Sequence, residues 1–388
     1  MMTVDERIAA VARLGFTERH ARFLVHVMLF SGICLPRQYA RSAGTAYGHN
    51  VTDFFAKLVK DRYVTACRCL HNRGRLYHVH DRRLYAAIGE PRHPHRRAVP
   101  ARQVIERLMR LDGVVSQTKV RWLVTEAEKV AYVRKRAPSF ATERLPHIAA
   151  GAGPRRRVRL FSEDVLMGVG ESQETTFVYV VTSPVEEDWR RVVSRYGDLL
   201  GAVPRWVFRA CFPPDQKGRM SRFHILFREE LAEPLSPRTL DDLRWHFEQL
   251  RKGAGPRTPR EENRFQDGQV QLLVNPRFRV LHQRWLIDGE AAFEVASSHA
   301  VVEHLGNGTG QVSCVLLPVS YRHVSPLVSP RPYAAQEGRE GGRAGATKGE
   351  EDSARPRPPL DDDDPSDPAG CVRDWRRLVD ADKALSAQ

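Results

Sequence analysis

The 388-residue sequence predicts a mixed α/β protein, α+β overall, in which a helical unit that ends in a β-hairpin precedes a larger α/β domain. Three observations support this fold class. Apolar residues recur at helical spacing through residues 4–60. Two β-like runs joined by a short turn follow at 63–70 and 75–80. Helix and strand patterns then alternate from residue 104 to about residue 330.

Composition divides the chain into four regions. Residues 1–90 are dense and periodic, and "PRHPHRRAVPARQ" over 91–103, rich in proline and arginine, predicts a linker. Residues 104–330 form the predicted α/β domain, for which we expect self-association or partner binding. Residues 331–388 hold few large apolar side chains, which predicts a disordered tail with one short helix over 371–385.

The first region contains four predicted helices, at 4–15, 17–32, 35–44 and 48–60. The last of them carries an apolar stripe that includes Val51, Phe54 and Leu58. Two short helices separated by a glycine turn and followed by two strands are typical of a winged helix-turn-helix, in which the strands form the wing.

Charge indicates what this region binds. The formal net charge is +14, and residues 1–110 hold twenty Lys/Arg against eight Asp/Glu. Arginine outnumbers lysine, and its guanidinium matches phosphate and base edges well. A polyanion is therefore the expected partner, with nucleic acid favoured over a membrane surface.

Other classes of protein fit less well. No stretch of eighteen apolar residues occurs, so no membrane-spanning helix is predicted. The N-terminus "MMTVDERIAAVARLG" carries early acids and resembles neither a secretory signal nor a transit peptide. Six cysteines in this length do not indicate a disulfide framework, which favours a reducing cytoplasm. No cofactor is predicted.

The predicted DNA contacts lie on two helices and the wing. At the start of the helix over 48–60, a reader helix would place polar side chains at base edges, and later cations would meet phosphates. The helix over 35–44 would cross the backbone, and the wing tip would reach backbone or minor groove. The expected contact residues are Arg37, Gln38, Arg41, His49, Asn50, Thr52, Lys57, Lys60, Arg62, Arg73 and Arg75. Tyr39 and Tyr47 are interpreted as packing residues.

The hairpin "ACRCLHNRGRLYHVH" raises a metal alternative. A two-residue turn at Arg73 and Gly74 pairs Cys69 with His78 and Cys67 with His80 on one face. Two Cys and two His form a legitimate zinc set, but strand neighbours stand too far apart for tetrahedral convergence. We therefore predict no metal and interpret these side chains as the inner face of the wing.

This order of elements, ending in "RLYHVHDRRLYAAIG", resembles the replication-relaxation type of winged-helix protein found on mobile genetic elements. The resemblance covers about residues 15–90. It implies double-stranded DNA binding, specific for sequence or structure, by the helix over 48–60 and the wing over 63–80. It also implies a part in transcription regulation or maintenance of a mobile element. Members often carry a nuclease-like second domain.

The second domain tests that implication. Its predicted β-β-α-β order over 155–213 is compatible with a restriction-endonuclease-like fold, in which Asp164 is the first metal-binding acid. The next strand offers Tyr179 and Val181 where an acid and a lysine are needed, and Glu171 and Glu174 lack a partner lysine. We therefore expect a scaffold without catalytic residues, a homodimer being one arrangement, with a metal-dependent nuclease as the alternative.

Two further patterns leave alternatives open. Glu126, Glu128 and Lys129 form an acid–lysine trio on a predicted helix, and a surface ion pair is the simpler interpretation. Residues 293–324 run helix, glycine-rich turn, strand. They fit either a second winged helix, as in a two-domain replication initiator, or an α/β cap.

Overall fold

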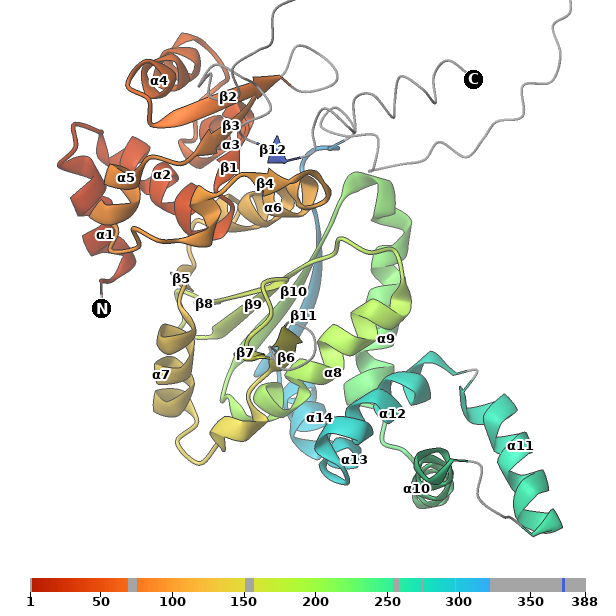
Figure 1. Cartoon of the computed structure of the whole chain (residues 1–388). Helices are drawn as coiled ribbons and strands as arrows, with labels where there is room; N and C mark the ends of the chain where they lie inside the picture. Colours follow the sequence, from red (N-terminus) through yellow and green to blue (C-terminus); the bar gives the residue numbers. More distant parts are fainter. Residues whose placement is uncertain are drawn as a thin grey trace, which may run out of the picture.

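The structure is a computed structural model that describes residues 2–68, 75–150, 157–253, 258–273, 275–296 and 298–321, with Val372–Arg373 (Figure 1). It has helices and mixed sheets, as the predicted α/β class requires. No helix within these ranges is long and apolar enough to span a membrane.

The first unit contains the four predicted helices and the two predicted strands. Thr3 caps the first helix through a capping box with Glu6, and Thr17 caps the second. A short strand precedes the third helix and joins the hairpin, which gives an antiparallel sheet. The elements are α1 (Val4–Ala12), α2 (Glu18–Phe30), β1 (Ile33–Cys34), α3 (Pro36–Ser42), α4 (His49–Lys60), β2 (Val64–Arg68), β3 (Arg75–Val79) and α5 (Arg82–Ala87), with sheet order β1-β3-β2.

The register of the β2–β3 ribbon differs from the predicted one. Thr65, rather than Cys69, is the Cα partner of His78, and Cys67 faces Leu76 rather than His80. The prediction assumed a two-residue turn, whereas β2 ends at Arg68 and β3 begins at Arg75. The longer connection keeps the parity of the faces but shifts every cross-strand pair.

The predicted linker over 91–103 is wrong, because this segment packs into the first unit. It forms η1 (Pro94–Arg96) and β4 (Val99–Pro100). The His95 side chain is hydrogen-bonded through Nδ1 to the Met28 carbonyl at 3.0 Å, and the His95 carbonyl lies 3.1 Å from Nε2 of His78. His95 is 6% exposed and Val99 is fully buried. Proline and arginine content suggested exposure, but the side chains between them are core residues.

The second part is built on a five-stranded sheet of order β11-β10-β9-β8-β5. β9, β10 and β11 are parallel, while β8 is antiparallel to both β9 and β5. Its strands are β5 (Arg121–Leu123), β8 (Val165–Val169), β9 (Thr175–Val180), β10 (Trp206–Phe212) and β11 (Gly310–Leu316). The other elements are α6 (Ala101–Val115), α7 (Glu126–Arg136), η2 (Thr142–Arg144), β6 (His147–Ala150), β7 (Arg157–Leu160), α8 (Glu186–Ala202), η4 (Pro214–Arg219), α9 (Met220–Leu231) and α14 (His299–Gly306).

The two faces of this sheet bury different partners, as strand alternation requires. Val178 and Val180 on β9 point to the side of α6 and join the apolar cluster of the first unit. Phe177 and Tyr179 point to the opposite side, where α8 and α9 cover the sheet. α6 therefore lies between the first unit and the sheet, and the molecule is layered (Figure 1).

Four helices inserted after α9 form a small lobe with its own apolar cluster. They are α10 (Pro237–Lys252), α11 (Pro259–Leu273), α12 (Pro276–Asp288) and α13 (Ala291–Ala296). Ser236 caps α10, since its side chain accepts a hydrogen bond from the Thr239 amide.

The later segments answer one open alternative. The described residues of the 293–324 segment do not form a second winged helix, because β11 joins β10 in parallel and completes the central sheet. The predicted tail and terminal helix lie outside the described residues, except that β12 (Val372–Arg373) pairs in parallel with β4.

Candidate functional site

The helix α4 has one buried and one exposed side. Val51, Phe54, Phe55 and Leu58 are at most 4% exposed, at the spacing that the sequence predicted. Phe54 packs against Tyr39 with ring centroids 4.5 Å apart, which fixes α4 on α3. The other side of α4 is therefore held outward on a rigid base.

Every residue predicted to make DNA contacts from α4 is exposed. The helix begins after Gly48, whose carbonyl accepts from the amides of Val51 and Thr52. The helix ends at Lys60, and Arg62 follows with a positive φ of 59°. The exposed predicted residues are His49, Asn50, Thr52, Lys57, Lys60 and Arg62.

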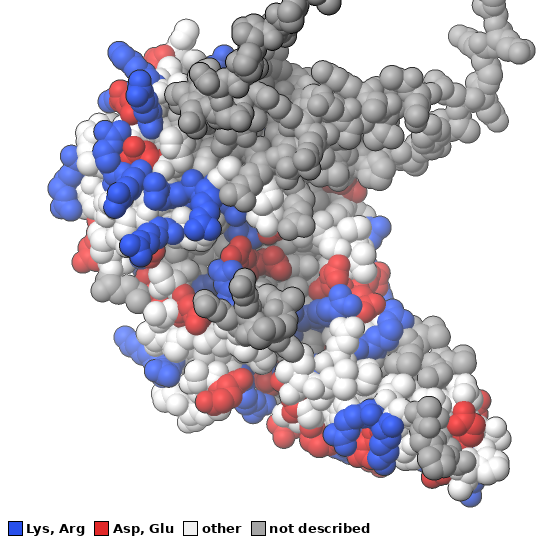
Figure 2. All heavy atoms as spheres, viewed as in Figure 1, with Lys and Arg blue, Asp and Glu red and all other residues white. Residues whose placement is uncertain are grey.

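Two exposed arginines from other elements also lie near the exposed side of α4, and the sequence did not predict either as a DNA contact. They are Arg19 of α2 and Arg83 of α5. The Arg83 guanidinium lies 4.8 Å above the Tyr63 ring and donates to the Asp61 carbonyl at 3.3 Å, beside the end of α4. Burial lowers the pKa of His20, and the nearby positive charges of Lys57 and Arg19 lower it further. Figure 2 shows Lys and Arg concentrated over the first unit, whereas charges of both signs cover the α10–α13 lobe.

The hairpin adds a second part to the face. Arg75 is exposed, and its hydrogen bond to Tyr77 partly offsets the rise in the pKa of Tyr77 that burial causes. Tyr47 is close enough to influence Tyr77 electrostatically, and it is 64% exposed. The packing role expected for Tyr47 is therefore wrong, whereas Tyr39, at 4% exposed, does pack. The loop before α4 thus lies beside the ribbon.

Two predicted contacts on α3 are wrong. Gln38 is fully buried, donates to the Leu108 carbonyl and accepts from the Leu35 amide, so it joins α3 to α6. Arg37 makes two hydrogen bonds of 3.0 Å to the buried Asp112 carboxylate. Only Arg41 on this helix is exposed as expected. A buried polar residue on a helix has the same sequence pattern as an exposed one, and partners 70 or more residues away leave no local signal.

The Cys/His alternative has no support in the described chain. Cys67 is disulfide-bonded, contrary to the expectation of reduced cysteines, and offers no thiolate. Cys69 and Arg73 lie outside the described residues. His80 is hydrogen-bonded to Thr65 at 2.9 Å, and His78 faces the His95 carbonyl. Within the described ranges, no three His, Cys, Asp or Glu side chains are arranged to hold a metal.

The structure also describes the residues at the positions where a restriction-endonuclease-like site would bind its metal. The Asp164 carbonyl accepts from the Val180 amide at the start of β8, and burial raises the pKa of its carboxyl. On β9 the required positions hold Tyr179 and, just beyond it, Val181, both buried. No acid–lysine pair stands on that strand, because β9 reads "TTFVYV".

Comparison of the sequence with protein-family models, curated proteins and solved structures found no match at a significant level. The geometry of the chain itself therefore carries the functional argument.

Proposed function

We propose that this protein binds double-stranded DNA through the exposed side of α4 and the adjoining β2–β3 ribbon. The order α2-β1-α3-α4-β2-β3 is the order of elements in a winged helix, with α4 as the reader helix. The observation that carries the proposal is the clustering of exposed cations on one side of a helix whose other side is core. The exposed cations on or near this side are Arg19, Arg41, Lys57, Lys60, Arg62, Arg75 and Arg83. The exposed acids there are Glu18, Asp53 and Asp61, and Arg83 is also paired with Asp81 at 3.2 Å.

Different side chains of α4 suit base contacts and phosphate contacts. Asn50 offers the amide geometry that pairs with adenine, and Thr52 offers a methyl group for thymine. Lys57 and Lys60, farther along, suit phosphates, which give affinity and salt dependence without sequence choice. The resemblance to replication-relaxation proteins supports a role in regulation or maintenance of a mobile element.

The test is fluorescence anisotropy with a labelled duplex over a salt series, using the wild type and a Lys57→Glu/Lys60→Glu variant. Reversing two phosphate-binding charges should abolish binding at salt concentrations where the wild type binds. Lys119→Glu/Lys217→Glu, which reverses two exposed lysines in the second part, is the matched control and should bind as the wild type does.

Two results would contradict the proposal. One is failure of the wild type to bind any duplex at low salt. The other is equal loss of binding in Lys57→Glu/Lys60→Glu and Lys119→Glu/Lys217→Glu, which would indicate unspecific attraction. Mg²⁺-dependent cutting that Asp164→Ala abolishes would instead favour the nuclease alternative.

A further inference from the structure

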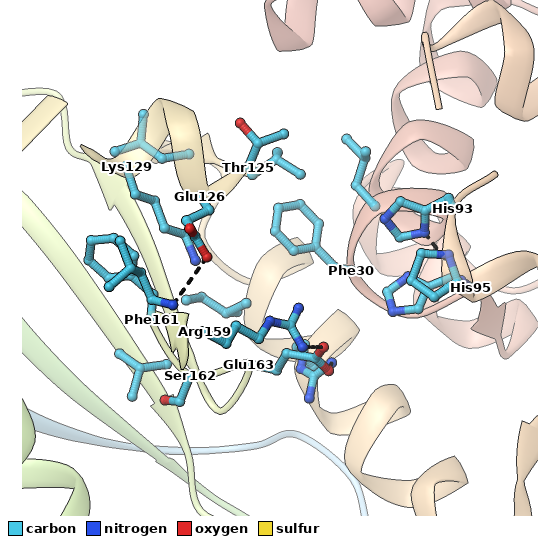
Figure 3. A pocket seen from close by; sticks show the side chains of 18 of the residues that line it. Phe30, His93, His95, Thr125, Glu126, Lys129, Arg159, Phe161, Ser162 and Glu163 are labelled. Carbon is cyan, nitrogen blue, oxygen red and sulfur yellow. Dashed lines mark hydrogen bonds and ion pairs between the residues drawn. The ribbon is translucent and has the colours of Figure 1, made fainter. Parts of the chain in front are cut away.

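A cavity of about 260 Å³ lies where the first unit meets the second part (Figure 3). One wall comes from the end of α2 and the 90–95 segment and includes Phe30 and His93. The opposite wall comes from α7 and β7 to β8 and includes Lys129 and Phe161. A ligand in this cavity would contact both parts of the molecule at once.

Lys129 is the cation of this cavity without a close counter-ion. Its Nζ lies 5.4 Å from the centre of the Phe161 ring. Among the described residues, no carboxylate oxygen lies within 4.0 Å of that nitrogen. Burial and the neighbouring Arg159 and Arg110 lower the pKa of Lys129, which Glu163 and Glu126 partly offset, so that it lies at about 8. An ammonium in such a place is stabilised by an added anion.

The cavity's carboxylates are engaged elsewhere. Glu163 accepts from Arg159 at 2.5 Å and from Arg110 at 3.3 Å. Glu126 accepts from the Leu160 amide at 3.1 Å, which ties α7 to β7. The third acid, Glu90, lies 3.9 Å from the buried Arg7. Arg110, Arg159, Glu163 and Glu90 thus each have an oppositely charged partner. Lys129 and Glu126 have none within 4.0 Å among the described residues, so Lys129 is the cation available to a ligand.

The rest of the lining indicates which uncharged part a ligand of this cavity would have. Apolar side chains from both walls line the space, including Leu29, Phe30, Leu160, Phe161 and Leu166. Pockets for drug-sized ligands are roughly 300–1,000 Å³, so this cavity suits a smaller molecule. Rings on the two walls favour a planar or aromatic body.

We propose that this cavity binds a small amphipathic anion, with its carboxylate or phosphate on Lys129 and its apolar or aromatic body between the two walls. The inference is independent of DNA binding, since it rests on the lining alone. Because the ligand would contact both parts, binding should also raise the unfolding temperature of the whole chain.

Isothermal titration of the full chain with benzoate and with phenyl phosphate tests the proposal. We expect saturable binding of at least one of them and no binding of benzamide, which has the same body without the charge. Preference for one anion identifies the head group. Lys129→Met should weaken binding about tenfold or more, as expected for loss of a charge-assisted hydrogen bond. Lys119→Met, at a lysine whose side chain is 75% exposed, should bind as the wild type does.

Three results would contradict the proposed anion site. Benzamide binding as tightly as benzoate would show that charge plays no part. Unchanged affinity in Lys129→Met, or absence of binding of either anion at millimolar concentration, would overturn the assignment. Comparing benzoate with benzamide on the wild type keeps the test decisive if Lys129→Met does not fold.

Discussion

The Arg37 guanidinium donates two parallel hydrogen bonds of 3.0 Å to the Asp112 carboxylate, one to each oxygen. The Tyr321 hydroxyl donates to the same carboxylate at 2.5 Å. Asp112 is fully buried on α6, Arg37 belongs to α3, and Tyr321 follows β11. This contact therefore joins the helix that supports α4 to the second part of the chain.

Removing one partner of this contact should destabilise the fold. Arg37→Met leaves the Asp112 charge buried without its cation, which costs about 3–5 kcal/mol in comparable cases. Urea unfolding followed by circular dichroism measures the loss. Arg22→Met is the control, since the pair with Glu18 is exposed and such pairs contribute at most about 1 kcal/mol. Equal stability of the two variants would contradict a structural role for Arg37.

Substitutions at different positions of α4 should change either the sequence specificity or the overall affinity of DNA binding. Asn50→Ala should reduce discrimination between cognate and altered duplexes by about 1–3 kcal/mol, because it removes a base-edge contact. Lys60→Ala should weaken binding to all duplexes alike and lower the slope of log K against log salt by about 1. Competition titrations at several salt concentrations measure both quantities. An Asn50→Ala variant with unchanged discrimination would exclude this residue from readout.

Acid should destabilise the first unit through buried neutral histidines. Burial lowers the pKa of His26 and of His78 to about 4, and that of His95 well below its usual 6.5. Between pH 6.5 and 4 the unfolded chain binds protons that the folded chain excludes. Stability is therefore complete above pH 6.5 and falls as the pH drops toward 4, by about 1.4 kcal/mol per unit of depression for each group.

Unfolding midpoints in urea at pH 7.5 and pH 5 measure this effect. His78→Gln should reduce the difference between the two midpoints, because glutamine does not titrate. His49→Gln, which changes an exposed histidine, should leave the difference unchanged. A midpoint that does not depend on pH would show that these histidines are not buried in solution.

Gly32 should be far more sensitive to substitution than Gly44. Both have a positive φ, of 76° and 64°, so alanine strains each backbone by about 1 kcal/mol. A Cβ on Gly32 would also lie 2.6 Å from the His95 carbonyl oxygen, whereas one on Gly44 meets nothing within 4 Å. Thermal unfolding of Gly32→Ala and Gly44→Ala measures the difference, and similar losses would indicate that the 94–96 turn does not pack there.

The sequence predicted what depends on local periodicity. The buried stripe of α4 follows from 3.6-residue spacing at Val51, Phe54 and Leu58, and the structure confirms it. The apolar run over 176–181 lies in the predicted β-β-α-β order, and most of it forms β9. Exposure of Lys57 and Lys60 follows from the same geometry.

What depends on distant partners could not be predicted. Arg37 and Gln38 resembled phosphate contacts because Asp112 and Leu108 are far away in sequence. The register of the ribbon depends on the length of its connection, which a run of turn residues leaves undefined. The cavity at Lys129 is formed by segments that only the fold brings together.

One apolar cluster runs from α1 through α6 to Tyr321 and includes side chains from both parts of the chain. Heat or denaturant should therefore melt them in a single cooperative transition. A fragment that stops at residue 90 would leave the apolar side of α2 and β3 bare to water, and it should aggregate rather than act as a portable module.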